Sequence, residues 1–310
     1  VMIDVNGLKT VNDAFGHQAG DLLLKRVADI LRLACRKEDL IARWGGDEFI
    51  VLLTNVNIET LTELETRIQE ACLKDHNGPV PLSISVGYAI KEEKRRTIEE
   101  YLKITEERMY RKKLDEGPLN RQKTLDYLEK VLEKISRENG KQIEGLNSLS
   151  KAFANELGLT DHEQDQLNLL VRFHDLGKIT IPQDIIDKNT ELTSEEWESI
   201  KKHSEIGYRI ANSSPELAPI AESILAHHER WDGRGYPQNL EGEKIPLLAR
   251  ILAIVEAYDV MRRGSRYKLP LTEEQAYQEI KTQSGNQFDP RLVEVFLQLI
   301  HQARLKKLAE

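Results

Sequence analysis

Residues 40–53, LIARWGGDEFIVLL, are two apolar runs joined by two glycines and two acids. Glycine permits a tight backbone turn, so Gly45 and Gly46 between strand-like runs predict a β-hairpin. A turn has no need of the two carboxylates that follow, Asp47 and Glu48. The hairpin therefore predicts both a sheet in this part of the chain and a binding site at its tip.

The segments on either side of the hairpin alternate between strand and helix patterns. Residues 1–5 form a short apolar run, and residues 82–90 are rich in strand-forming residues. Helical spacing of apolar residues predicts helices over residues 22–35, 57–74 and 97–113. Such alternation is typical of an α/β layer fold, in which helices flank a sheet.

The sequence beyond residue 115 predicts a helical linker followed by an all-α domain. Gly117 and Pro118 are expected to break the preceding helix. From residue 140 to the end, the chain shows helical patterns and no convincing strand. The expected organisation is an α/β domain over residues 1–115, a helical linker over 116–136 and an all-α domain over 137–305.

Four apolar residues of the linker follow three-four-three spacing: Leu125, Leu128, Leu132 and Ile135. This spacing is typical of a short coiled-coil seam between two copies of a chain. An amphipathic helix that packs on its own domain has the same spacing over so few turns. Both interpretations stay open.

Composition limits the classes of function. The 310 residues suffice for two ordinary domains, and 52 acidic against 44 basic residues give a net charge of −8. That charge supplies no basic field for long nucleic acid. The two cysteines, Cys35 and Cys72, are expected to be free thiols of a cytoplasmic protein. We expect no membrane segment, because no apolar run approaches the roughly 20 residues that span a bilayer.

Carboxylates from two elements are expected to meet at the hairpin tip. Asp4 interrupts a buried strand, and residues at strand ends can converge on Asp47 and Glu48. Hard oxygen ligands of this kind suit Mg²⁺ bound to a phosphate. The residues between the first strand and the helix near residue 21 are expected to form a polar loop for a triphosphate or a base. That loop contains Asn12, Gly16, Gly20 and Asp21.

DVNGLKTVNDAFGHQAGD, followed by RWGGDEF, resembles a GGDEF diguanylate cyclase domain over roughly residues 1–115. The resemblance implies that Asp4 and Asp47 hold Mg²⁺ (or Mn²⁺) and that Glu48 helps to hold the nucleotide at its ribose. It further implies condensation of two GTP to cyclic di-GMP by two such domains facing each other, hence a homodimer through this half and the linker. The implied nucleotide-binding residues are Asn12, Asp21, Gly45, Gly46 and Lys113.

Arg36-Lys37-Glu38-Asp39 matches the RxxD product-inhibition motif of the same family. The resemblance implies an inhibitory site for cyclic di-GMP formed by Arg36, Asp39 and Arg67. An arginine fork suits both phosphate and the guanine edge. An exposed pair at a helix end is the alternative for this motif.

Helical faces in the second half combine apolar residues with histidines and acids. His174, His203 and His227-His228 each follow apolar residues at helical spacing, and Glu256 shares a stripe with Ala249, Leu252, Ala253 and Val260. Several inward ionisable groups are costly to bury without partners, and a metal cluster satisfies them together. Imidazole and carboxylate ligands favour Fe or Mn, with Zn possible. Two such ions about 3.5–4 Å apart promote in-line attack on phosphorus.

FHDLGKITIP, LTSEEWESIKKHSEIG and HHERWDGRGYP resemble an HD-GYP phosphodiesterase domain over roughly residues 135–300. The resemblance implies an all-α fold that hydrolyses cyclic di-GMP to pGpG or GMP. Asp175 and Lys178 would act in catalysis, and Lys178 and Lys268 would contact phosphate. The loop of Gly235, Tyr236 and Pro237 would line the ligand pocket. The implied ligands of a di- or trinuclear centre are His174, Asp175, His203, His227, His228, Glu256 and Glu138.

Departures from both families support a second hypothesis. Gln142 stands where HD-GYP domains have a histidine, and Gly145 and Ser265 stand where they have arginines. GGDEF domains usually have helices before the position of Asp4, and this sequence has none there. A catalytically impaired module would sense GTP or cyclic di-GMP and transmit through the helices of residues 91–140. The intact carboxylates of the hairpin and the histidine set favour an enzyme. Both hypotheses stay open.

Overall fold

The computed structural model describes residues 1–75, 81–91, 96–136, 140–264 and 269–309. The chain forms two compact units, Val1–Leu128 and Glu129–Glu310. We call them unit 1 and unit 2 and describe each by itself. The expectation of two domains is confirmed.

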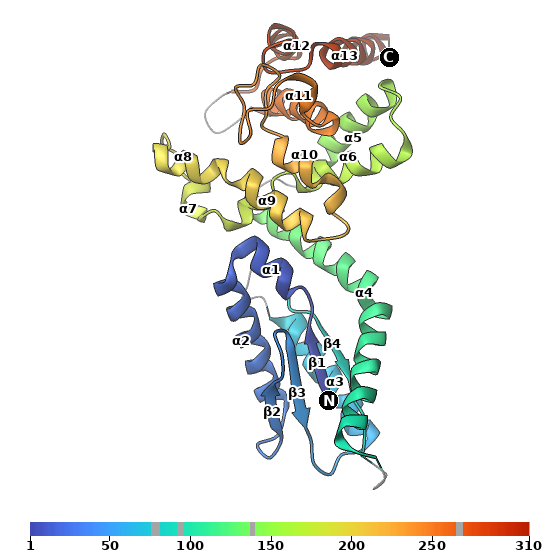
Figure 1. Cartoon of the computed structure of the whole chain (residues 1–310). Coiled ribbons are helices and arrows are strands. Elements are labelled where there is room, and N and C mark those ends of the chain that lie inside the picture. The colour runs from blue at the N-terminus through green and yellow to red at the C-terminus, as the bar shows by residue number, and fades with distance from the viewer. Residues whose placement is uncertain (76–80, 92–95, 137–139, 265–268, 310) are drawn as a thin grey trace. The chain divides into compact units, whose positions relative to one another are not determined.

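Unit 1 is built on a four-stranded antiparallel sheet in the order β2-β3-β1-β4 (Figure 1). The hairpin of residues 40–53 is present as β2 (Leu40–Arg43) paired with β3 (Glu48–Leu52). β1 (Met2–Val5) lies between β3 and β4 (Ile84–Gly87), and all four of its residues are buried. This central strand is therefore the one that carries Asp4 into the interior.

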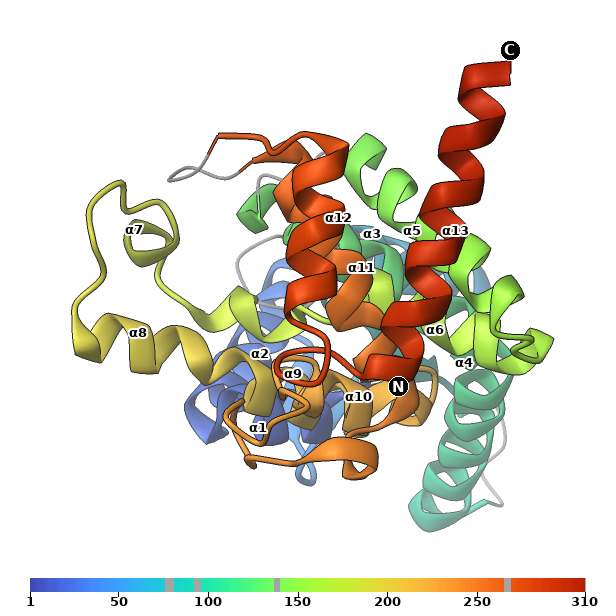
Figure 2. The same cartoon turned by 90° about the horizontal axis from the view of Figure 1, so that it is seen from above.

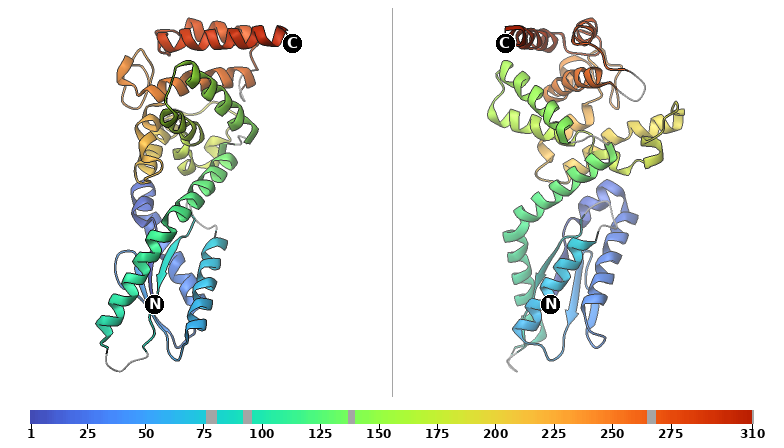
Figure 3. Two further views of the ribbon diagram at one scale, coloured as in Figure 1. Left: turned by 90° about the vertical axis from the view of Figure 1, so that its right-hand side faces the viewer. Right: turned by 180° about the vertical axis from the view of Figure 1, so that it is seen from behind.

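Helices cover the sheet and form its core. α2 (His17–Ala34) and α3 (Ile58–Lys74) flank the sheet (Figure 3) and share one apolar cluster with it. α4 (Ile98–Ser136) approaches β4 at Gly87, where an added Cβ would lie 2.3 Å from the Thr105 carbonyl oxygen. The α/β prediction is confirmed.

The prediction of a polar loop before a helix near residue 21 is wrong. α1 (Leu8–Phe15) already contains Asn12, and the first turns of α2 contain Gly20 and Asp21. Only Gly16, with φ of 83°, separates the two helices. The apolar spacing of Leu8, Val11 and Phe15 supports α1, and polar residues on its other face conceal the pattern.

The expected break at Gly117 and Pro118 is also wrong, because α4 runs through both positions as one helix. A proline inside a helix removes one backbone hydrogen bond and bends the axis, while the turns on either side keep theirs. The end of α4 belongs to unit 2, where Leu132 is 5% exposed and Glu129 forms a bidentate ion pair with Arg172. These contacts favour the interpretation in which the linker helix packs on its own domain.

Unit 2 is helical throughout the residues that the structure describes, apart from isolated bridges (Figure 2). The all-α prediction is confirmed. Its elements are α5 (Gly140–Glu156), α6 (Asp161–Phe173), η1 (Leu176–Thr180), α7 (Gln183–Ile186), α8 (Ser194–Lys201), α9 (His203–Asn212), η2 (Ala218–Ile220), α10 (Ala221–Ala226), η3 (Gly242–Lys244), α11 (Leu247–Arg263), α12 (Glu273–Thr282) and α13 (Pro290–Ala309).

Capping residues and a central helix fix where these helices begin and end. Thr160, Thr193 and Thr272 each start a helix with a reciprocal capping box, which satisfies amide groups of the first turn. α11 is buried along most of its length and contacts α5, α6, α10, α12 and α13. None of the helices in the described part of the chain is long and apolar enough to cross a membrane.

Candidate metal centre and nucleotide hairpin

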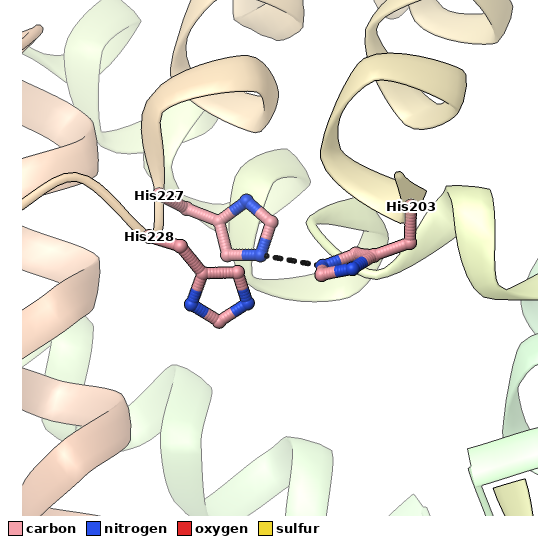
Figure 4. A group of neighbouring side chains, drawn as sticks. All are labelled: His203, His227 and His228. Atoms are coloured by element: carbon pink, nitrogen blue, oxygen red, sulfur yellow. Dashed lines mark hydrogen bonds between the residues drawn. The ribbon is translucent and has the colours of Figure 1, made fainter. Parts of the chain in front are cut away.

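The histidines of unit 2 lie at helix ends. His174 follows the last residue of α6, His203 is the first residue of α9, and His227 and His228 follow α10. Asp175 comes directly before η1. Because these helix ends meet, residues that are far apart in the sequence become neighbours. Figure 4 shows His203, His227 and His228 grouped in this way.

The ligand atoms of this cluster lie close together. His203 Nε2 is 3.1 Å from His227 Nε2 and 3.5 Å from Asp175 Oδ1. His174 Nε2 is 3.7 Å from Asp175 Oδ2 and 3.8 Å from Glu256 Oε1. One ligand atom each from His203, His227 and His228 lies within 4.8 Å of the others. The side chains therefore converge on one place.

A shared hydrogen-bond pattern fixes three imidazoles in the same tautomer. In each, Nδ1 lies within 3.0 Å of the backbone carbonyl oxygen three residues earlier. A carbonyl oxygen can only accept, so Nδ1–H donates and the lone pair lies on Nε2. This pattern is typical of histidines that bind metal through Nε2. The three pairs are His174 with Val171, His203 with Ile200, and His227 with Ile224.

The facing lone pairs of His203 and His227 require a cation. Two Nε2 lone pairs 3.1 Å apart repel each other unless a positive charge satisfies both. A proton is a poor candidate, because burial lowers the pKa of His203 and, still further, that of His227. Burial and the neighbouring His203 also lower the pKa of His228 to about 3. A metal ion is therefore the partner that fits this donor set.

Asp175 supplies the negative charge of the cluster. Burial alone would raise the pKa of this carboxyl group. Lys178, with Nζ 2.5 Å from Asp175 Oδ2, and the three neighbouring histidines together outweigh burial and hold the pKa well below its usual value. An ionised carboxylate beside neutral imidazoles is the protonation state that metal binding needs. Lys178 thus lies beside the cluster, and its expected contact with phosphate stays a prediction.

Two glycines permit the close approach that brings Asp175 to His203. A Cβ on Gly177 would lie 1.9 Å from the His203 carbonyl oxygen, and one on Gly207 would lie 2.9 Å from a methyl carbon of Ile224. η1, α9 and α10 pack against one another at these points. Any larger residue would separate Asp175 from the histidines.

A cavity of about 940 Å³ opens beside the cluster. His227, His228 and Glu256 line one part of it, and Gly235 and Tyr236 line another. The Tyr236 ring lies 4.8 Å from the His228 ring, measured between centroids. The volume is in the range of ligand pockets, so the cluster faces a space that holds a sizeable substrate.

Glu229 anchors the loop that follows the two histidines, and the sequence motifs did not predict this role. Its side chain is 4% exposed and accepts hydrogen bonds from the backbone N–H of Gln238 at 2.6 Å and of Leu240 at 3.0 Å. The loop backbone also approaches Gly235, where a Cβ would lie 2.4 Å from the Arg230 nitrogen. The sequence signal was an acid directly after the histidine pair.

Of the remaining residues expected at the site, the structure describes Glu256 and leaves three others outside the described residues. Glu256 reaches His174 with its side chain 28% exposed. Val260 of the same stripe is 40% exposed and lines the same cavity as Glu256. Glu138, Ser265 and Lys268 lie outside the described residues.

In unit 1, three carboxylates gather around the hairpin tip. Asp4 is 5% exposed and pairs across the strands with Glu48, and the Val5 N–H donates to the Asp47 carbonyl at 2.9 Å. Burial, then Asp47 and Asp4, raise the pKa of Glu48. Lys113 Nζ lies 2.7 Å from Asp4 Oδ1. Asp4, Glu48 and Lys113 thus share one neighbourhood with Asp47, and excess negative charge there favours a cation.

The turn itself is held by Arg43, which donates to the Gly46 carbonyl at 2.7 Å and to the Gly45 carbonyl at 3.2 Å.

Two residues expected to bind the nucleotide lie on α1 and α2. Asn12 packs against Gly20, where a Cβ would lie 1.9 Å from Asn12 Oδ1. Asp21 is exposed on α2. The Asn12 side chain of α1 therefore packs directly against the backbone of α2 at Gly20.

The residues of the expected inhibitory site meet at the end of α2. The Arg36 N–H donates to Asp39 Oδ2 at 2.7 Å, so these two residues form a turn. Arg67 of α3 donates to the carbonyl of Ala34 beside it. The structure brings all three residues to one place, and their role stays a prediction.

Two family models match the chain. Residues 118–292 match the model described as "HD domain", and residues 1–117 match the model described as "Diguanylate cyclase, GGDEF domain". A helical domain with imidazoles and a carboxylate at its helix ends is a metal-binding domain of the HD class. The chain belongs to the HD domain family and carries a GGDEF domain in front of it, so both resemblances are confirmed.

Curated relatives match just over half of the chain. "3'3'-cGAMP-specific phosphodiesterase 2" of Vibrio cholerae is 38% identical over 55% of this chain and 33% of its own length. "Cyclic di-GMP phosphodiesterase" of Thermotoga maritima is 38% identical over 56% of this chain and 48% of its own length. "Cyclic di-GMP phosphodiesterase response regulator RpfG" of Xanthomonas campestris is 34% identical over 56% of this chain and 47% of its own length. The chain thus spans a third to about half the length of these relatives.

Proposed function

We propose that unit 2 is a metal-dependent phosphodiesterase that hydrolyses cyclic di-GMP to pGpG or GMP. The observation that carries the proposal is the pair of facing Nε2 atoms of His203 and His227 beside Asp175, at the wall of a cavity of about 940 Å³. The relatives named for cyclic dinucleotide phosphodiesterases support the substrate class.

The residues of the cluster divide the work. His174, His203, His227, His228, Asp175 and Glu256 would hold two ions of Fe or Mn, with Zn as a third option. Bound metal supplies Lewis-acid stabilisation of charge on the phosphate and activation of water. Lys178 keeps Asp175 ionised and offers a cation to a non-bridging phosphate oxygen. Tyr236 lines the space in which the nucleotide is bound.

Unit 1 is proposed to bind GTP with Mg²⁺ or Mn²⁺ at Asp4, Asp47 and Glu48 and to condense two GTP when two copies of the chain face each other. The grouped carboxylates and the raised pKa of Glu48 support cation binding there. A specific contact favours a second candidate, a GTP sensor without turnover. Lys113, expected to contact phosphate, is ion-paired with Asp4, the expected metal ligand.

One experiment tests both halves. The whole chain, reconstituted with Mn²⁺ or Fe²⁺, is incubated with cyclic di-GMP and, separately, with GTP and Mg²⁺, and the nucleotides are separated by chromatography. We expect loss of cyclic di-GMP with pGpG or GMP as product. An unchanged cyclic di-GMP pool with metal bound would refute the phosphodiesterase. Binding of GTP without product would select the sensor for unit 1.

A further inference from the structure

The segment of residues 183–201, α7 with α8, forms an arm that extends from unit 2 (Figure 2). In these two helices, which the structure describes in full, no side chain is buried. The arm is nonetheless ordered internally, since Lys188 Nζ lies 2.5 Å from Glu196 Oε2 and Thr193 caps α8. The arm therefore keeps a definite shape without serving the hydrophobic core.

Trp197 and Lys201 of this arm line the cavity that also contains His228 and Tyr236. They stand four residues apart on α8 and therefore on one helix face. The Trp197 side chain is 47% exposed although it is a large aromatic residue. Lys201 Nζ lies 5.8 Å from the Tyr236 ring centroid and forms an ion pair with Glu198. The arm thus presents an indole face and an ammonium group to the cavity.

The chemistry of these groups matches a purine base. An exposed indole is a stacking surface for a nucleobase, and a lysine donates to the O6 and N7 acceptors of guanine. The imidazoles fix where the phosphodiester is bound, so a base attached to the same nucleotide extends along the cavity wall away from them. Trp197 and Lys201 are on that wall.

We propose that Trp197 and Lys201 form a guanine-recognition subsite of the cavity, in which Trp197 stacks on the base and Lys201 donates to O6 and N7. Adenine carries an amino group at position 6, where guanine has the O6 acceptor, and an amino group cannot accept a hydrogen bond from the lysine. Lys201 therefore selects guanine over adenine. The inference rests on the proposed function and names the part of the site that reads the base.

Kinetics on the metal-reconstituted whole chain test the stacking role. We expect Trp197→Ala to raise KM for cyclic di-GMP about tenfold or more, whereas Trp197→Phe, which keeps an aromatic face, retains most of the affinity. Bound metal, measured by elemental analysis, is expected to be the same in both variants as in the unmodified chain, so that a change in KM reports on the base. A Trp197→Ala chain with unchanged KM for cyclic di-GMP would overturn the subsite.

A matched pair of lysines tests the selectivity. Lys201→Ala is expected to lower the preference for cyclic di-GMP over cyclic di-AMP by about five- to tenfold in kcat/KM. Lys202→Ala removes a neighbouring exposed lysine that does not line the cavity, and we expect no change in preference. Equal effects of the two substitutions would contradict the role of Lys201.

Binding separates failure of the subsite from failure of the proposed function. In a Trp44→Phe, Trp231→Phe chain, Trp197 is the sole tryptophan, and we expect cyclic di-GMP to quench its fluorescence. Quenching without hydrolysis would keep the subsite and reject the phosphodiesterase. Hydrolysis without quenching, together with an unchanged KM in Trp197→Ala, would reject the subsite alone.

Discussion

At the scale of single residues, the proposed metal cluster is defined by how each imidazole is held. The Nδ1 hydrogen bonds of His174, His203 and His227 direct Nε2 toward the same space. Asp175 contributes the ionised carboxylate, kept so by Lys178 together with the neighbouring histidines. Loss of one member therefore removes a ligand and also leaves the remaining charges without a partner.

Replacement of Asp175 tests the cluster directly. We expect Asp175→Ala to lower hydrolysis of cyclic di-GMP by more than ~100-fold and to reduce bound metal in elemental analysis, since a ligand and a countercharge are lost together. Asp165→Ala, which changes an exposed carboxylate of the neighbouring α6, is the control and should keep both values. Full metal content together with the normal rate in Asp175→Ala would refute the mechanism.

The buried histidines also predict how the metal-free chain responds to pH. The pKa of His228 is about 3 in the folded state, against about 6.5 in an unfolded chain. The unfolded state thus binds more protons below pH 6.5, so the stability that the neutral imidazole contributes is full above that pH and is lost as pH falls towards 3. Between pH 7.5 and 5.5, His228 alone should lower the free energy of unfolding of unit 2 by about 1.4 kcal/mol.

Denaturant titration of the chelator-treated chain at these two pH values measures this difference. His228→Gln, which cannot titrate, should show a smaller difference between the two pH values than the unmodified chain. Since His203 and His227 have pKa values lowered in the same direction, part of the slope remains in the variant. A pH dependence that is identical in both chains would be incompatible with a buried neutral His228.

At the scale of helices and strands, close backbone contacts decide whether the ligands meet. Gly177 of η1 touches the carbonyl of His203, and Gly207 of α9 touches Ile224. These contacts determine the distance between the helix ends on which Asp175, His203 and His227 lie. The packing of these helices therefore decides whether the proposed ligands lie close enough to share a metal ion.

Alanine at Gly177 should force η1 away from α9. We expect Gly177→Ala to destabilise unit 2 by about 1–3 kcal/mol and to weaken metal binding, because a Cβ there would lie 1.9 Å from a backbone oxygen that has no flexible way to give. Gly145→Ala is the matched control, since Gly145 lies in α5 with nothing within 4 Å of an added Cβ. There, alanine should be neutral or stabilising by up to about 1 kcal/mol.

Thermal unfolding and metal content of the two variants provide the comparison. If Gly177→Ala matched Gly145→Ala in both, the close contact of η1 with α9 would not be needed to assemble the centre.

Sequence patterns predicted the elements better than the details at their ends. The hairpin around Gly45 and the helical second half follow from local spacing, so they were predictable from short windows. The break expected at Pro118 was wrong because a long helix tolerates the loss of one hydrogen bond. The contacts of Gly177 and Glu229 depend on which helices become neighbours, and no local window contains that information.

At the scale of the whole molecule, the chain joins two units with separate cores and separate proposed cation sites. The sheet core of unit 1 is one apolar cluster, and the core of unit 2 is built around α11. The carboxylates around Asp4 suit Mg²⁺ with a triphosphate, while the imidazoles around Asp175 suit a transition metal. A ligand that binds only the folded state of one unit stabilises that unit by RT ln(1 + [L]/Kd).

The two cation sites should therefore be separable in one calorimetric experiment. We expect Mn²⁺ at about 100 times its Kd to raise the free energy of unfolding of unit 2 by about 2.7 kcal/mol. GTP with Mg²⁺ should instead raise the free energy of unfolding of unit 1. Asp175→Ala should abolish the first shift and keep the second, and Asp47→Ala should do the reverse, because each change removes a ligand from one site alone. A single transition that shifts as a whole with either ligand would show that the cores unfold together. A GTP shift that survives Asp47→Ala would place the nucleotide away from the hairpin tip.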